Sequence, residues 1–216
     1  MSVMGAKLPH LGKPEFESRL LGCSPVELSD DAVRKLWLHY QELVRWNPTV
    51  SLVGPGTADE IVERHYGESL AAVPCLDPLW RVVVDVGSGG GFPGVVLSAV
   101  VPKLEVVLVE SRGRKCAFLD TVIRKAALPC RCLGARVGVT PPEGLPPKID
   151  LVTSRAVNLS PSALEGLSSR MSAQGGAFFW VGAEAPNLPE MWAETGRIEL
   201  PGSRSRSIMQ VRVRAE

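Results

Sequence analysis

Two different periodicities of hydrophobic residues divide this chain into two parts. After Arg81, short apolar runs rich in β-branched residues alternate with longer segments whose apolar residues recur at helical spacing. The short runs predict strands and the longer segments predict helices. The expected strands are 82–86, 104–110, 130–134, 149–153, 176–181 and 207–214, and the expected helices are 93–101, 112–126, 160–171 and 187–194. This alternation predicts an α/β fold, a mostly parallel sheet with helices on both faces. The last strand alternates apolar and polar residues singly, as at a sheet edge with one wet face.

Upstream of these strands only the helical rhythm is present. A stripe of apolar residues follows Ser29, which is suited to cap a helix, and this helix is expected to end near Pro48 because proline disfavours helix at the residue before it. The capping-box sequence at 57–60 predicts a second helix that runs to about Ala72. Residues 1–28 are poorly patterned.

Length and charge narrow the class of protein. A chain of 216 residues with a net charge of +1 suits one α/β domain with an extension, and we expect a helical extension at 1–75 packed on a core at 76–216. Any contact with nucleic acid must then come from a local basic patch. No apolar run approaches the roughly 18 to 20 residues of a membrane span, and the N-terminus lacks the apolar core of a secretory signal, so no membrane partner is expected.

The cysteines point to a reducing compartment. There are 5 of them, an odd number with scattered spacing, which argues against a disulfide framework and for the cytoplasm. No second Cys or His pair stands near Cys130 and Cys132 to complete a zinc site, so no metal is expected.

The richest chemical signal is the glycine-rich turn after the first strand. Its spacing is Asp85-x-Gly87-x-Gly89-x-Gly91, with Ser88 inside the turn, and Pro93 suits the first turn of a helix. A strand, a glycine turn and a helix start allow a ligand to lie against backbone. A carboxylate there repels a pyrophosphate but attracts a cationic ligand such as S-adenosylmethionine, which carries a sulfonium and an ammonium group.

The second strand ends at Glu110. An acid in this place commonly holds ribose hydroxyls, so Glu110 is expected at the cofactor; a solvated strand end is the alternative.

Several motifs resemble those of one family. Trp46-Asn47, then Arg64-His65-x-x-Glu68-Ser69, then Phe92-Pro93-Gly94, then Ser154-Arg155-Ala156 occur in that order. Together, over about residues 30–214, they resemble the bacterial small-subunit (16S) ribosomal RNA guanine-N7 methyltransferase, the glucose-inhibited division protein B family.

The resemblance implies a Rossmann-like methyltransferase fold, S-adenosylmethionine as donor, and 16S ribosomal RNA or the small subunit as partner. It places Gly87 and Phe92 at the cofactor and the backbone of Val137 and Gly138 beside the adenine. It gives Arg155 a role at the mouth of the active site, where we expect both cofactor contact and catalysis.

The chain departs from the family pattern in three places. Ser51-Leu52-Val53 replaces Asn-Leu-Thr, Val181 replaces a lysine at the end of the fifth strand, and Gly138 replaces an acid. Losing the lysine removes a cation that faces RNA phosphate or the methionine carboxylate, which leaves the affinity for substrate and the target open.

The chemistry of the residues agrees with guanine N7. Exocyclic amines are usually methylated with an Asn/Asp-Pro-Pro-aromatic loop, which is missing at 153–156, and pyrimidine C5 needs an attacking cysteine. N7 has an exposed lone pair and no proton to lose, so it needs positioning but no general base. Arg155 cannot act as a base, and it is expected to orient or to act by its charge.

Two basic clusters are candidates for RNA contact, since clustered cations supply affinity that is independent of sequence. The first cluster, for which a solvated helix face is the alternative, contains Arg112, Arg114, Lys115, Arg124 and Lys125. The second lies near the C-terminus and contains Arg204, Arg206, Arg212 and Arg214. His65 is expected either to pair with Glu68 and close the pocket or to be a packed helical histidine. The chain is expected to act as a monomer.

Three other functions remain open at this stage. One is a methyltransferase of the same fold that acts on a small molecule or a protein. Another is a dinucleotide-dependent oxidoreductase, which Asp85 and the glycine spacing disfavour. The third is a non-catalytic RNA-binding assembly protein.

Overall fold

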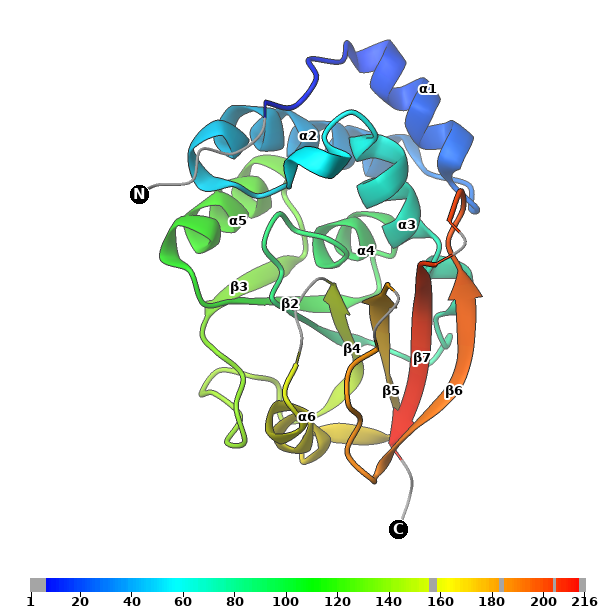
Figure 1. Ribbon diagram of the computed structural model, residues 1–216. Helices are drawn as coiled ribbons and strands as arrows, with labels where there is room; N and C mark the ends of the chain where they lie inside the picture. The colour runs from blue at the N-terminus through cyan, green and yellow to red at the C-terminus, as the bar shows by residue number, and fades with distance from the viewer. Residues whose placement is uncertain (1–6, 156–158, 183–184, 204, 214–216) are drawn as a thin grey trace.

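One seven-stranded sheet with flanking helices organises the molecule (Figure 1). The computed structural model describes residues 7–155, 159–182, 185–203 and 205–213. The strands are β1 (Val82–Val86), β2 (Glu105–Glu110), β3 (Cys130–Gly134), β4 (Ile149–Arg155), β5 (Met171–Val181), β6 (Trp192–Glu199) and β7 (Ser207–Val213). Their order is β3-β2-β1-β4-β5-β7-β6, with β1 to β5 parallel and β7 antiparallel to both its neighbours. The expected α/β, Rossmann-like class is confirmed, and the strand order reverses between β1 and β4, where such sheets bind ligands.

Alternate residues of the central strands enter two separate cores. Val83 and Leu108 face a core shared with the N-terminal helices and with helices α4 (Gly94–Val100) and α5 (Gly113–Ala126). Val84 and Val107 face a second core that contains Leu164 of helix α6 (Pro161–Ser168). Because side chains of a strand alternate between its faces, the solid apolar runs are explained by a sheet that is covered on both sides, as Figure 1 shows.

The helices follow the sequence signals with a few exceptions. They are α1 (Lys13–Cys23), α2 (Asp30–Val50), α3 (Glu68–Leu70), α4 (Gly94–Val100), α5 (Gly113–Ala126) and α6 (Pro161–Ser168), with shorter turns η1 (Pro55–Thr57), η2 (Val62–Gly67) and η3 (Val73–Cys75). Ser29 caps α2 as expected, since its side chain accepts a hydrogen bond from the backbone N–H of Ala32 at 3.2 Å.

The expected end of α2 near Pro48 is wrong, because the helix continues to Val50. The buried side chain of Asn47 explains the extension. Its Oδ1 accepts hydrogen bonds from the backbone N–H groups of Leu52 and Val53, both at 2.7 Å. These contacts tie the last turn to the chain that follows, and they outweigh the local preference of the residue before proline.

The second helix expected from 57 to about 72 forms only in part, over 61–70, and not as one regular α-helix. The chain instead forms η1, the π-helical turn η2 and the short helix α3. The guanidinium of Arg155 donates to the backbone carbonyls of Arg64 at 2.6 Å and His65 at 3.4 Å. A side chain from β4 therefore binds carbonyls within the π turn, an arrangement that is frequent at functional sites.

The C-terminal part of the sheet differs most from expectation. The helix predicted at 187–194 is wrong: residues 187–191 are loop and turn, and β6 begins at Trp192. The last strand, β7, is not a sheet edge, because it lies between β5 and β6. Trp192 and Ile198 bury or half-bury their side chains in β6 while Glu194 and Arg197 face water. The alternation is interrupted between Glu194 and Gly196, where the pairing of β6 with β7 shifts in register.

Helix α1 has no counterpart in the sequence analysis. Only Phe16 and Leu20 bury their side chains in it, so its apolar stripe is too sparse to stand out. Both residues belong to the same hydrophobic cluster as Val95 and Phe118 of the sheet-flanking helices. None of the helices in the described part of the chain combines the length and the apolarity that crossing a membrane requires.

Candidate active site

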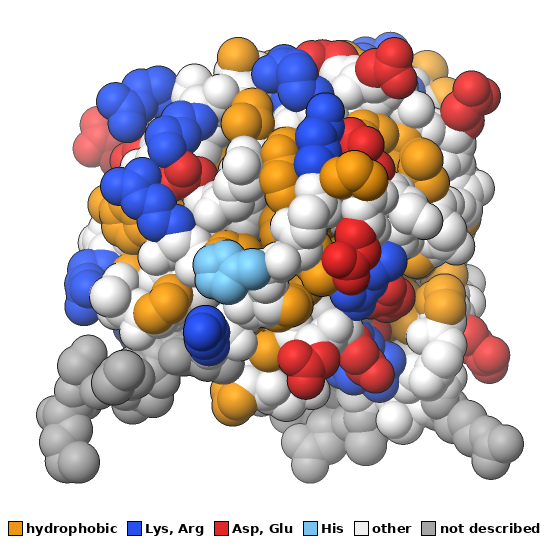
Figure 2. Space-filling model, turned by 90° about the horizontal axis from the view of Figure 1, so that it is seen from above, with side chains coloured by type: hydrophobic (Ala, Val, Ile, Leu, Met, Phe, Trp, Pro, Cys, Tyr) orange, Lys and Arg blue, Asp and Glu red, His pale blue; other side chains and the backbone are white. Residues whose placement is uncertain are grey.

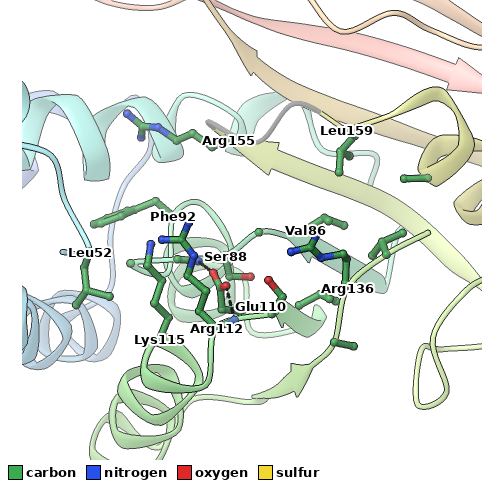
Figure 3. A pocket seen from close by; sticks show the side chains of 18 of the residues that line it. Leu52, Val86, Ser88, Phe92, Glu110, Arg112, Lys115, Arg136, Arg155 and Leu159 are labelled. Atoms are coloured by element: carbon green, nitrogen blue, oxygen red, sulfur yellow. Dashed lines mark hydrogen bonds between the residues drawn. The ribbon is translucent and has the colours of Figure 1, made fainter. Parts of the chain in front are cut away.

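A cavity of about 630 Å³ opens beside the carboxyl ends of β1, β2 and β4 (Figure 3). This volume lies in the range of small-molecule sites. Figure 3 shows Glu110, Arg112 and Lys115 projecting from one side and Arg136 and Leu159 at another end. The parallel strands thus bring sequence-distant loops to one edge of the sheet, as such folds do.

The glycine turn forms one wall of the cavity. Gly87, Gly89 and Gly91 have φ values of 75°, 52° and 90°. Residues with a side chain rarely adopt this left-handed region of backbone conformation, so these positions of the turn require glycine. The backbone N–H groups of Gly87 and Ser88 donate to the carbonyl of Val109 at 2.8 and 3.1 Å, which folds the turn over the end of β2. Gly87, Ser88, Gly89 and Phe92 line the cavity, whereas Gly91 does not.

Glu110 joins the glycine turn to the helix that follows β2. Its Oε2 accepts the N–H of Gly89 at 3.0 Å, and its Oε1 accepts the N–H of Arg112 at 2.9 Å. The carboxylate is 7 % exposed and lines the cavity. A carboxylate has about four lone-pair sites, so further ones remain to accept ligand hydroxyls. The expected contact of Glu110 with a ribose stays a prediction.

Asp85 lies behind the turn, which corrects the expectation that its carboxylate meets the ligand. The residue is fully buried and is not part of the cavity wall. Its Oδ1 accepts a hydrogen bond from the hydroxyl of Thr153 at 2.8 Å, and its Oδ2 accepts the N–H of Gly94 at 3.3 Å. Burial raises the pKa of Asp85 to about 6. Asp85 thus joins β1, β4 and the start of α4.

An arginine cluster around Glu68 adjoins the cavity through Arg155, which lines it, whereas Glu68, Arg64 and Arg206 do not; we call this cluster the mouth. Glu68 Oε2 accepts from Arg155 Nη2 at 2.8 Å, and its Oε1 accepts from Arg206 Nε at 3.0 Å. Arg64 Nε lies 3.2 Å from the same Oε1. Glu68 keeps only 4 % of its side chain exposed. Burial lowers the pKa of Arg155 to about 10, while the charge of Glu68 acts in the opposite direction. Arg155 lines the cavity, although its guanidinium points away from Arg136 (Figure 3).

His65 does not pair with Glu68, so that expectation is wrong: the arginines occupy the carboxylate. The Nε2 of His65 instead lies 2.8 Å from the hydroxyl of Thr57. Its ring lines the cavity, 5.0 Å from the ring of Phe92. Burial lowers the pKa of His65 to about 3, helped by the charge of Arg155. The imidazole is therefore neutral near pH 7.

The residues expected beside the adenine separate in the structure. Val137 lines the cavity, whereas Gly138 does not. The carbonyl of Gly138 lies 2.2 Å from the position that a Cβ on Gly166 would take, so this backbone packs tightly against α6. Gly138 therefore supports the wall from outside.

The expected RNA-binding residues fall into different places. Arg112 and Lys115 line the cavity, and burial lowers the pKa of Lys115. Arg114 is exposed, and Arg206 binds Glu68. Arg204 lies outside the described residues.

The face over the N-terminal helices carries many Lys and Arg side chains, which Figure 2 shows mixed with Asp and Glu. Several of these cations form ion pairs there, among them Arg34 with Asp31 at 2.6 Å and Lys125 with Glu42. Asp31 also pairs with Lys35 and Glu42 also pairs with Arg45, so two cations share each of these carboxylates.

Some cavity residues were missed by the sequence analysis: Val86, Val109, Ser111, Ala135, Arg136, Leu159, Ser160 and Ala163. The motif Ser160-Pro161 marks a helix start, and Ser160 does cap α6 through the N–H of Ala163 at 3.2 Å. That signal predicts where α6 begins but not which part of the fold lies next to its start. The order of the strands in the sheet brings the start of α6 to the cavity. No group of metal-ligating side chains is found among the described residues.

Comparisons with known proteins agree with this geometry. Residues 32–205 match the family model GidB, described as rRNA small subunit methyltransferase G. Ribosomal RNA small subunit methyltransferase G of Anaeromyxobacter sp. (strain Fw109-5) is 35 % identical over 208 residues, which cover 91 % of this chain and 96 % of the relative. The protein of the same description from Jannaschia sp. (strain CCS1) is 32 % identical over 173 residues, or 76 % of this chain and 80 % of that one.

Solved structures agree on the fold. A mutant of MtNAS in complex with S-adenosylmethionine superposes with a TM-score of 0.58 at 15 % identity, over 84 % of this chain and 72 % of that chain. At this identity the likeness concerns the fold alone.

Proposed function

This chain belongs to the family of the rRNA small subunit methyltransferase G, which depends on S-adenosylmethionine and methylates a guanine of small-subunit ribosomal RNA, and from this premise we propose that the acceptor atom is N7. Family membership over most of the chain argues against the oxidoreductase alternative. It also argues against a small molecule or a protein as the substrate.

The residues around the cavity fit S-adenosylmethionine. The glycine turn offers backbone at Gly87 and Gly89 without side chains, and the carboxylate of Glu110 suits ribose hydroxyls. Val137 and Leu159 supply an apolar wall of the kind that an adenine ring needs. When bound, the cofactor supplies an electrophilic methyl group on its sulfonium.

The observation that carries the choice of N7 is the lack of an available base among the described cavity residues. Those with a side chain able to accept a proton near pH 7 are His65 and Glu110. The pKa of His65 is lowered to about 3, and its Nε2 already contacts Thr57. Glu110 is held by two backbone N–H groups at the strand tip, and we assign its remaining lone pairs to the ribose hydroxyls of the cofactor. Guanine N7 carries a lone pair and no proton, so it is a nucleophile that needs no base, only correct placement.

Arg155 is proposed to act by orientation at the mouth. Methylation at N7 leaves a positive charge on the guanine, so an unpaired cation beside the base would oppose the reaction. Glu68 partly neutralises Arg155 at 2.8 Å. The cluster of Arg64, Arg155 and Arg206 exceeds its two carboxylates, Glu68 and Glu60, by one charge, and this excess favours RNA phosphates near the mouth.

Mass spectrometry of small-subunit ribosomal RNA tests the proposal, with cells that carry or lack the gene. We expect one N7-methylguanine to disappear with the gene and to return when the purified protein and S-adenosylmethionine are added to the RNA or the subunit. Methylation at another atom of guanine would overturn the choice of N7. Binding of the cofactor without turnover on either substrate would favour the assembly-protein alternative.

We further propose that the protein acts as a monomer in the cytoplasm. The support is that one chain supplies every described wall of the cavity and that the substrate is ribosomal RNA. Light scattering of the purified protein tests the first part. A stable dimer at assay concentration would contradict it.

A further inference from the structure

The fully buried imidazole of His39 touches the glycine turn from the N-terminal helices. It lies on α2, and its Nε2 is 2.8 Å from the backbone carbonyl of Gly90. A carbonyl oxygen only accepts hydrogen bonds, so Nε2 must carry the proton. The hydroxyl of Tyr66 lies 3.0 Å from Nδ1 and therefore donates to it. The two bonds together define one neutral tautomer and one ring orientation.

The contact is specific to the part of the turn that reaches the cavity. The peptide between Gly90 and Gly91 directs its carbonyl to His39 and its N–H to the carbonyl of Ser88, at 2.6 Å. Both ends of this peptide are thus bound, and its plane cannot rotate without losing a buried hydrogen bond. Gly89, Gly90 and Ser88 belong to the cavity wall. Gly91 has a φ of 90°, and a Cβ added there would lie 3.1 Å from His39 Nε2.

The same ring contacts residues on the substrate side. Its centroid is 5.1 Å from that of Phe92, which lines the cavity, and 5.5 Å from that of Tyr66. Tyr66 follows His65, another cavity residue, in the π turn whose carbonyls Arg155 binds. His39 thus lies between the cofactor turn and the segment that carries the mouth.

We infer that His39 is a positioning residue for the cofactor: it holds the Gly90–Gly91 peptide in the orientation in which the glycine turn binds S-adenosylmethionine. The inference deepens the cofactor site on which the proposed function rests. The N-terminal helices then contribute to cofactor affinity as well as to packing. Burial agrees with this role, since it lowers the pKa of His39 to about 4 and keeps the ring neutral near pH 7.

Three variants separate positioning from packing. His39→Phe keeps a ring in the core but removes both hydrogen bonds. His39→Gln retains an amide N–H for the carbonyl of Gly90. Tyr40→Phe is the matched control, because Tyr40 is buried on the same helix and its hydroxyl bonds Pro9 and Leu11 rather than the turn.

Calorimetry with S-adenosylhomocysteine and thermal unfolding are measured on each full-length variant. We expect the Kd to rise about tenfold in His39→Phe, or about 1.4 kcal/mol, and less than threefold in His39→Gln and Tyr40→Phe. In methylation assays the KM for S-adenosylmethionine should rise in His39→Phe while kcat changes little. A Kd within twofold of wild type in His39→Phe, or an equal loss in Tyr40→Phe, would overturn the inference.

A spectroscopic readout stands even if His39→Phe fails to fold. Nitrogen NMR of the wild-type protein should show His39 protonated at Nε2 alone and unchanged between pH 8 and 6, although Tyr66 and His65 are titratable neighbours. The opposite tautomer, or an ordinary titration near pH 6.5, would contradict the geometry. If wild-type protein binds no S-adenosylhomocysteine, the cofactor site itself fails, which is a separate outcome.

Discussion

The cofactor end of the cavity and the mouth are held together by different kinds of interaction. At the cofactor end, the glycine turn and Glu110 come from neighbouring strands, and backbone hydrogen bonds such as Gly89 N–H to Glu110 at 3.0 Å hold them. At the mouth, Glu68 meets Arg155 and Arg206, which lie 87 and 138 positions further along the chain, through charged side chains. The first end therefore depends on sterics and backbone shape, and the second depends on charge balance in a buried place. Variants should separate these two dependencies.

The largest expected effect comes from removing the shared carboxylate at the mouth. Glu68→Gln leaves the buried Arg155 and the half-buried Arg206 without their counter-ion, and it leaves Arg64 with Glu60 alone at 3.5 Å. Removing one partner of a buried ion pair costs about 3–5 kcal/mol. We expect the free energy of unfolding in urea to fall by about that amount, and the exposed pair variant Glu194→Gln to change it by less than about 1 kcal/mol. Equal small effects would mean that the cluster is solvated.

At the cofactor end, a side chain added to the glycine turn should abolish ligand binding by steric clash. Gly87 has a φ of 75° and lines the cavity, so Gly87→Val forces a branched side chain into a left-handed backbone and into the ligand space. We expect affinity for S-adenosylhomocysteine to fall at least about a hundredfold, or about 2.7 kcal/mol, in calorimetry. Gly113→Ala is the control, because nothing lies within 4 Å of its added Cβ. A normal Kd in Gly87→Val would remove the turn from the binding site.

Asp85 combines the dependence on backbone shape with the dependence on charge, because its ionisable side chain supports the backbone of the glycine turn from behind. Its pKa is raised by burial to about 6, above the value of about 3.9 of an unfolded chain. The stability gained from the protonated form is therefore present below about pH 4 and is lost as the pH rises through 6. We expect the free energy of unfolding of Asp85→Asn to gain roughly 2 kcal/mol relative to wild type between pH 4 and 7.

Asp150 gives the opposite sign and serves as the control for this pH dependence. Its pKa is lowered, with hydrogen bonds from the backbone of Arg81 and Val82 favouring the charged form. Its contribution is lost as the pH falls, so the deficit of Asp150→Asn should shrink in acid. Parallel pH profiles for Asp85→Asn and wild type would show that Asp85 is not buried as described.

Arg155 tests whether the mouth serves chemistry as well as stability. Arg155→Ala should lower the single-turnover methylation rate at least about tenfold, or roughly 1.4 kcal/mol, because the π turn loses its guanidinium and His65 loses its anchor. Arg155→Lys should restore the rate only in part, since lysine keeps the charge but not the planar fork. Wild-type rates at saturating RNA and cofactor in the folded Ala variant would leave Arg155 as a structural ion-pair partner.

The smallest effect is expected outside both ends of the cavity. Arg114 is exposed at the start of α5, near the opening. If it contacts a phosphate, Arg114→Ala should weaken RNA binding a few-fold and lower the salt slope of the affinity by about one. Arg197→Ala on β6 is the control, since Arg197 pairs with Glu194 at 2.6 Å. The same salt slope of RNA affinity in the wild type, Arg114→Ala and Arg197→Ala would mean that the RNA does not contact Arg114.

The sequence by itself determined the central unit of this protein. The strand, glycine turn and helix from Val82 to Val100, and Glu110 at the tip of the next strand, were predicted because their causes are local: side-chain period, left-handed glycines and a strand end. The family motifs added the cofactor and the substrate class. The division at residue 75 stays a prediction.

Only the tertiary structure decided the rest. The π turn, the strand β6 and the inward carboxylate of Asp85 each depend on a partner far along the chain: Arg155, β7 and Thr153. His39 also depends on a distant partner, because nothing near it in the sequence predicts its contact with the carbonyl of Gly90, 51 positions away. Burial decides which polar groups must pair, and the pairing in turn selects the backbone. Burial is a property of neighbours in space, which local pattern does not contain.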